Sequence, residues 1–121
     1  MNQSILDSVK KVLGLGLDYD VFDEEVLLHI NSVLATLNQL GIGPDSGFYV
    51  EDRTATWQDF LGDDPNLNGV KSYLALSVRL LFDPPQNSNI TSAIKEQIKE
   101  FEWRANVYRE DKQWSTHTKT T

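Results

Sequence analysis

Apolar residues recur every three or four positions along most of this 121-residue chain. This spacing puts them on one face of an α-helix, whereas a half-buried β-strand would alternate apolar and polar residues. Four segments follow it: residues 5–13, 22–40, 65–82 and 90–108. A chain of this length forms one domain with a single core. We therefore predict an all-α fold, a small bundle of about four helices.

Residues that start and stop helices separate these segments. Ser4 precedes the first segment as a candidate N-cap, and Gly14 ends it. The third segment stops at Pro84 and Pro85, because a proline disfavours helical geometry in the residue before it and donates no backbone hydrogen bond. The Pro-Pro pair therefore marks a turn between two helices. A PxxP ligand is excluded, since the sequence contains no PxxP.

Two regions depart from the helical pattern. Residues 41–62 combine the loop-forming GIGPDSG with a short β-like run, which predicts an irregular insert that can hold a β-hairpin, followed by one helical turn after Thr56. Residues 111–121 are polar and without apolar period, which predicts a flexible tail after a single domain over residues 1–110. In this tail, we expect Trp114 either to order on a neighbouring protein or to fold back on the last helix.

Composition limits the classes of function. Eighteen acidic residues against eleven basic ones give a net charge of −7, which repels nucleic-acid phosphates and anionic lipid surfaces. The absence of cysteine excludes disulfides and thiolate metal sites. No apolar run reaches the roughly 18 residues of a membrane span, so we expect a soluble protein that is cytoplasmic when made.

Residues that could support chemistry are few. The candidates for metal binding or acid–base catalysis are Asp18, Asp20, Asp23, His29, Asp63, Asp64 and His117. The first three do not fit the spacing of a calcium loop and suit a helix start, while Pro65 marks the acidic pair before it as a helix cap. Neither histidine has a second ligand at metal-binding spacing. We predict no enzyme activity, no metal and no cofactor.

Some apolar or uncharged residues lie away from the predicted core stripes, where a solvated face would carry Lys and Glu. The candidate interface residues are Leu28, Ser32, Ala35, Trp57, Phe60, Leu80, Trp103, Val107 and Trp114. For Trp57 and Phe60, a core position is the simpler alternative. The others indicate a second apolar surface for a partner, unless the small bundle wraps far enough to cover them.

The order of four segments carries a family resemblance. DEEVLLHINSVLATLNQLGIGP, TWQDFLG, VKSYLALSVRLLFDPP and AIKEQIKEFEWRANVYRE follow one another between Ser4 and Glu110. In this order they resemble the head-tail connector (adaptor) proteins of tailed bacteriophages and prophages of Gram-positive bacteria. No single segment is a chemical fingerprint, so the resemblance rests on all four together.

The resemblance implies a structural role in the virion. Such a subunit forms a homo-oligomeric ring, of about twelve copies, beneath the portal protein at the head-tail junction. The ring extends the DNA channel and docks the stopper or tail-completion protein, with DNA as passive cargo and no membrane contact, and it is assembled in the host cytoplasm. The resemblance carries no catalytic residues. The alternative is a free-standing helical binding module, a small regulator without a virion role.

Overall fold

The computed structural model describes residues 3–63 and 67–119, with side chains for residues 3–63 and 67–107. Five helices form within these ranges, and the all-α prediction is confirmed. They are α1 (Ile5–Leu13), α2 (Asp23–Gln39), α3 (Trp57–Leu61), α4 (Leu67–Phe82) and α5 (Ser88–Lys119).

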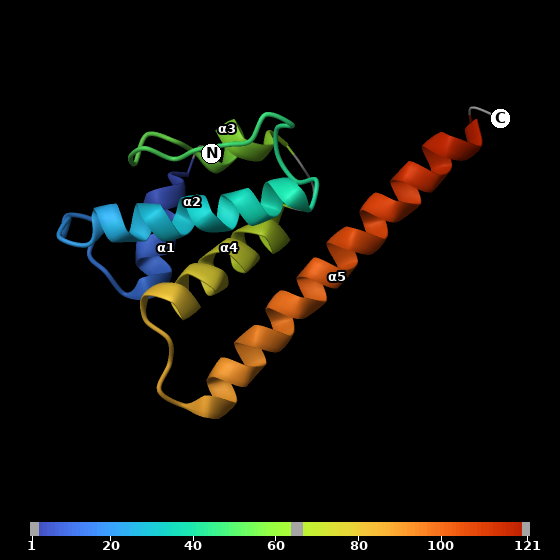
Figure 1. Ribbon diagram of the computed structural model, residues 1–121. Helices are drawn as coiled ribbons and strands as arrows, with labels where there is room; N and C mark the ends of the chain where they lie inside the picture. Colours follow the sequence, from blue (N-terminus) through green and yellow to red (C-terminus); the bar gives the residue numbers. More distant parts are fainter. Residues whose placement is uncertain (1–2, 64–66, 120–121) are drawn as a thin grey trace.

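Helix α4 is the centre of the arrangement. It packs against α1, α2 and α5, while α1 also contacts α2 (Figure 1). The central position explains why α4 is apolar on two sides of its surface, with Leu74 buried towards the core and Tyr73 stacked on Phe101 of α5. Helix α5 packs along α4 with its first half, and its second half extends beyond the other helices (Figure 1).

The fully buried cluster comes from α1 to α4 and the insert. Its members are Ile5, Leu6, Val9, Val26, Ile30, Val33, Leu34, Leu37, Val50, Trp57, Phe60, Val70, Tyr73, Leu74 and Val78. On α5, Ile98 and Phe101 pack against this cluster as partly buried residues, and Ile94 is buried but lies outside the cluster. The core is therefore largely complete without α5.

Side chains at the helix ends satisfy the backbone groups that a helix leaves free. The Ser4 hydroxyl accepts from the backbone N–H of Asp7, and Thr56 forms a reciprocal capping box with Asp59. At the other end of α1, Gly14 adopts a φ of 77°, a left-handed conformation that glycine adopts without strain. Helix α4 ends at Phe82, before the two prolines, as predicted.

The insert holds no β-hairpin in its described residues, 41–62. The backbone of Val50 pairs instead with a side chain of α2: Asn31 Oδ1 accepts from its N–H at 2.8 Å, and Asn31 Nδ2 donates to its carbonyl at 3.0 Å. The end of the insert pairs with the start of the chain through one isolated bridge, Ser4 to Thr56. These partners satisfy the backbone of Val50 and of the end of the insert, so neither needs a second strand.

Helix α5 is longer than the sequence predicted. The apolar period stops near Val107, yet the helix continues to Lys119, through most of the region expected to form a separate tail. The flexibility of residues 111–121 stays a prediction. The predicted cap at Asp64 and Pro65 lies outside the described residues.

Candidate interaction surface

The exposed face of α2 has the composition predicted for it. Ser32 and Ala35 are exposed, and Leu28 keeps 68% of its surface accessible, while Ile30 and Val33 of the opposite face are buried. Neither Ser32 nor Ala35 carries a charge, so little on this face opposes burial against a protein partner.

The structure corrects two of the candidate interface residues. Trp57 and Phe60 are only 2% and 4% exposed and belong to the core. The indole N–H of Trp57 donates to the Ser8 hydroxyl at 3.0 Å, and Phe60 packs on Phe48 with ring centroids 5.1 Å apart. Both face inward because the insert folds back over α1 and α2, so neither is available to a partner.

The remaining candidates lie on α4 and α5. Trp103 is 66% exposed on the side of α5 away from α4, whereas Leu80 and Val107 are half-buried. Trp114 lies outside the residues whose side chains are described. Among the residues predicted to form the second apolar surface, Trp103 is therefore the most exposed one on the described part of α5.

The seam between α4 and α5 combines one aromatic stack with one polar contact. The rings of Tyr73 and Phe101 lie 4.5 Å apart, and the Tyr73 hydroxyl donates to Glu102 Oε2 at 3.3 Å. Burial, with the Glu102 carboxylate beside it, raises the pKa of Tyr73 to about 12. A shallow groove of about 210 Å³ follows this seam, lined partly by Leu76 and Ile98. It offers no cluster of ionisable groups typical of a catalytic site.

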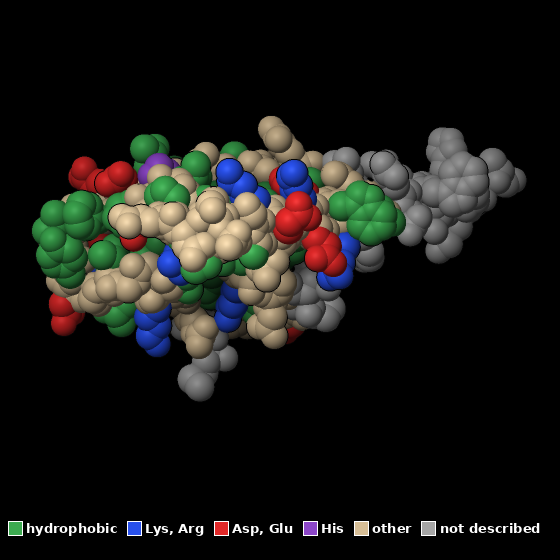
Figure 2. All heavy atoms as spheres, turned by 90° about the horizontal axis from the view of Figure 1, so that it is seen from below, with side chains coloured by type: hydrophobic (Ala, Val, Ile, Leu, Met, Phe, Trp, Pro, Cys, Tyr) green, Lys and Arg blue, Asp and Glu red, His purple; other side chains and the backbone are tan. Residues whose placement is uncertain are grey.

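Another apolar surface, which the sequence did not predict, lies on the α1–α2 connection. Its exposed side chains, which we call the loop patch, are Leu17, Tyr19, Val21 and Phe22. Figure 2 shows hydrophobic side chains gathered at this end of the molecule. Phe22 also packs edge-on against Phe82, at the end of α4, with centroids 5.5 Å apart. The sequence signal that could have indicated this surface is the alternation of apolar residues with glycine or aspartate in LGLDYDV, residues 15–21. We interpreted its aspartates as the acidic start of a helix instead.

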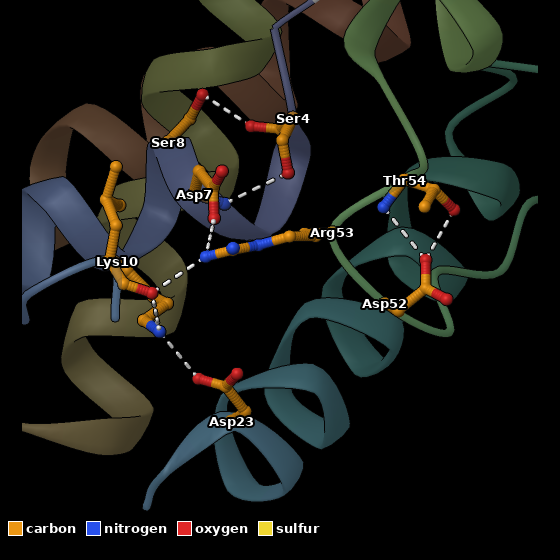
Figure 3. Close-up of polar contacts among 9 residues, drawn as sticks. Ser4, Asp7, Ser8, Lys10, Asp23, Asp52, Arg53 and Thr54 are labelled. Carbon is orange, nitrogen blue, oxygen red and sulfur yellow. Dashed lines mark hydrogen bonds and ion pairs between the residues drawn. The ribbon is translucent and has the colours of Figure 1, made fainter. Parts of the chain in front are cut away.

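Polar contacts hold the loop that carries this patch. Lys10 of α1 is fully buried, and its ammonium lies 2.8 Å from Asp23 Oδ1 and 3.1 Å from the Leu17 carbonyl (Figure 3). Arg53 of the insert donates to the same carbonyl at 2.7 Å and pairs with Asp7 at 3.3 Å. Two cations, Lys10 before the loop and Arg53 after it in the sequence, thus both donate to the Leu17 carbonyl. We call this arrangement the Lys10 clamp.

The turn that presents Arg53 has its own anchor. The backbone N–H and the hydroxyl of Thr54 both donate to the Asp52 carboxylate (Figure 3), and these hydrogen bonds lower the pKa of Asp52. The sequence KK at positions 10 and 11 gave no sign of the clamp, because periodicity alone does not say which lysine is buried.

The candidates for chemistry do not form a site. Within residues 3–63 and 67–107, no three His, Asp or Glu side chains are gathered as a metal would require. Asp23 is engaged by Lys10, and Asp18, Asp20 and Asp63 are exposed, while Asp64 and the side chain of His117 are outside the described set. In the part of the chain that the structure describes, none of the helices has the length and apolar character to cross a bilayer.

Comparison with known proteins gives one match. A family model described as phage connector protein matches residues 5–112, nearly the whole chain. The comparisons of this chain with curated proteins and with solved structures found no match. The matched range includes the helices and insert that carry both exposed surfaces, and it favours a virion component over a free-standing regulator. This chain belongs to the phage connector protein family, whose members serve as structural components of the head-tail connection.

Proposed function

We propose that the chain is a subunit of a ring at the neck of the virion, beneath the portal protein. The ring, of about twelve copies, extends the DNA channel and docks the stopper or tail. The observation that carries this proposal is the family match over residues 5–112. A Gram-positive host and assembly in its cytoplasm remain expectations from the resemblance.

The exposed face of α2 is proposed as one docking surface of the ring. Leu28 protrudes from a face on which Ser32 and Ala35, its neighbours towards the C-terminal end of α2, are small and uncharged, so a partner can bury this side of the face without desolvating a charge. Its exposure also makes it a clean test, because a substitution there leaves the core intact.

Leu28→Asp should leave the helical circular dichroism signal and the melting temperature nearly unchanged while abolishing incorporation into the head-tail junction. Incorporation is measured by the amount of the chain in purified particles and by their infectivity. Tyr49→Asp, which alters an equally exposed apolar residue of the insert, is the matched control and should be incorporated normally. Normal particles from Leu28→Asp would contradict the assignment of this face.

DNA is proposed to pass through the ring without being held. The net charge of −7 disfavours contact with phosphates, so the isolated chain should not shift duplex DNA at about 0.15 M salt, where the Debye length is about 8 Å. An electrophoretic mobility assay over a salt series tests this expectation. Tight, salt-sensitive binding would contradict the passive channel.

A further inference from the structure

The loop patch exposes apolar residues on a loop that is not free to rearrange. Val21 is 67% exposed, yet the neighbouring Leu17 carbonyl is held by both Lys10 and Arg53, and Asp23 is held by Lys10. Fixed presentation lowers the entropy that binding must overcome, so the loop patch has the properties of a prepared docking surface.

The electrostatic surroundings of the loop patch identify the chemistry of its partner. The exposed carboxylates of Asp18, Asp20, Glu24 and Glu25 flank the patch in sequence, and they outnumber the nearby cation Arg53, which is engaged by Asp7 and the Leu17 carbonyl. Asp83 adds another exposed carboxylate beside Phe82, which contacts Phe22. An apolar surface with an acidic rim is complementary to a segment that combines an aromatic residue with basic ones.

The second half of α5 has this complementary composition. Trp103 is exposed, and from there to Lys119 the basic residues are Arg104, Arg109, Lys112 and Lys119, against Glu110 and Asp111. This segment is thus net positive in a chain whose overall charge is −7. It extends from the helical body at the end opposite the α1–α2 connection (Figure 1). Because the two surfaces lie at opposite ends, one copy does not pair them within itself.

We propose that the second half of α5 of one copy docks on the loop patch of the next copy. The contact is heterologous, since two different surfaces meet, and repeated heterologous contacts generate a closed ring when the rotation between copies closes. Trp103 supplies the apolar anchor, and Arg104, which pairs with Glu100 within the isolated chain, exchanges this partner for the acidic rim of the next copy. This inference rests on the proposed function, which supplies the ring. The residues of the contact are assigned from the exposed surfaces of the single chain.

Two blocked variants test the contact through complementation. Val21→Asp blocks the loop patch and leaves α5 intact, whereas Trp103→Glu blocks α5 and leaves the loop patch intact. Both positions are largely exposed, so both variants should keep the wild-type circular dichroism spectrum. Tyr49→Asp is the control at an exposed position outside both surfaces.

Sedimentation velocity over a concentration series provides the measurement. The wild type and Tyr49→Asp should self-associate, and each blocked variant alone should show at least about a tenfold weaker association, as expected when an anchor residue is lost. An equimolar mixture of Val21→Asp and Trp103→Glu should form a heterodimer and nothing larger, because each pair retains one intact contact. Raising the salt concentration should weaken this heterodimer.

Three results would overturn the proposal. They are a wild type that stays monomeric throughout, a mixture that forms no heterodimer, and blocked variants that associate like the wild type. A monomeric wild type would assign the loop patch to a different protein. Failure of the connector role gives a different result: the heterodimer forms, but the wild-type chain is missing from purified necks. If the heterodimer fails to form while both variants enter necks normally, only this contact is wrong.

Discussion

The α1–α2 end of the body and helix α5 are attached to the molecule in different ways. At the α1–α2 end, the connection, the insert and both helices are tied by contacts of distant residues, including the Lys10 clamp and the Asn31–Val50 pair. Helix α5 is attached chiefly to α4, through one seam, and among the α5 side chains that the structure describes, up to residue 107, only Ile94 is buried. Both regions nevertheless expose large apolar residues, Val21 in one and Trp103 in the other.

The comparison shows that exposed apolar residues occur both on a loop held by polar contacts and on a helix attached by one packed seam. The loop patch is held by polar contacts to the buried Lys10 and to the partly exposed Arg53, so its shape is set before any partner binds. Helix α5 depends on a single packed seam, so it is the part of the molecule that can separate from the body at the lowest free energy. A rigid surface and a movable helix are suited to complementary roles in one contact.

Ile30→Asp should have the largest effect of the substitutions considered. Ile30 is fully buried in the middle of the α2 core face, and a carboxylate there has no partner. The loss of stability should be on the order of 5 kcal/mol or more, enough to unfold the chain. Thermal and urea denaturation followed by circular dichroism measure it, with Leu28→Asp two residues away as the control. A folded Ile30→Asp would mean that the two faces of α2 are reversed.

Lys10→Ala tests the support of the loop patch. Removing the ammonium leaves the Asp23 carboxylate and the Leu17 carbonyl without this partner, and we expect a loss of about 3 kcal/mol, the lower end for a broken buried ion pair because Asp23 keeps part of its exposure. Lys11→Ala, at the adjacent exposed lysine, should change the unfolding free energy by less than about 0.5 kcal/mol. Equal effects of the two substitutions in urea denaturation would disprove the clamp.

Ile94→Asp tests the attachment of α5. Because Ile94 is buried on α5 but lies outside the core cluster of α1 to α4, the charge can reach water when α5 separates from α4. We expect about 1–3 kcal/mol of destabilisation, confined to α5. Hydrogen exchange should accelerate in the first half of α5 and remain slow in α1 and α2. Uniform acceleration across the body would show that α5 is part of the same cooperative unit.

Alkaline pH should weaken the same seam by a smaller amount. The pKa of Tyr73 is raised from 10.0 to about 12, so the fold favours the neutral hydroxyl. Its contribution to stability is therefore complete below pH 10 and is lost as the pH rises from 10 to 12. Tyr73→Phe should remove this part of the pH dependence, whereas Tyr49→Phe, at an exposed tyrosine, should keep it. Urea denaturation at a series of pH values provides the comparison, and identical profiles for the two variants would contradict the assignment.

The sequence by itself determined the helices and their inward faces. The apolar period located α1, α2 and α4 to within a few residues, and it separated Ile30 from Leu28 correctly. Caps and breakers acted as expected at Ser4, Thr56 and Pro84, because these effects depend on neighbouring residues along the chain. The uncharged face of α2 could be predicted for the same reason.

Only the tertiary structure decided which residues meet across the chain. Lys10 is buried and Lys11 is exposed because Asp23 and the Leu17 carbonyl lie beside the first, and no local pattern distinguishes the two. Trp57 became a core residue because the insert folds over α1, and Asn31 replaced the expected hairpin partner of Val50. Helical periodicity is a local property, whereas burial depends on segments far apart in sequence, which is why the loop patch and its clamp emerged only from the fold.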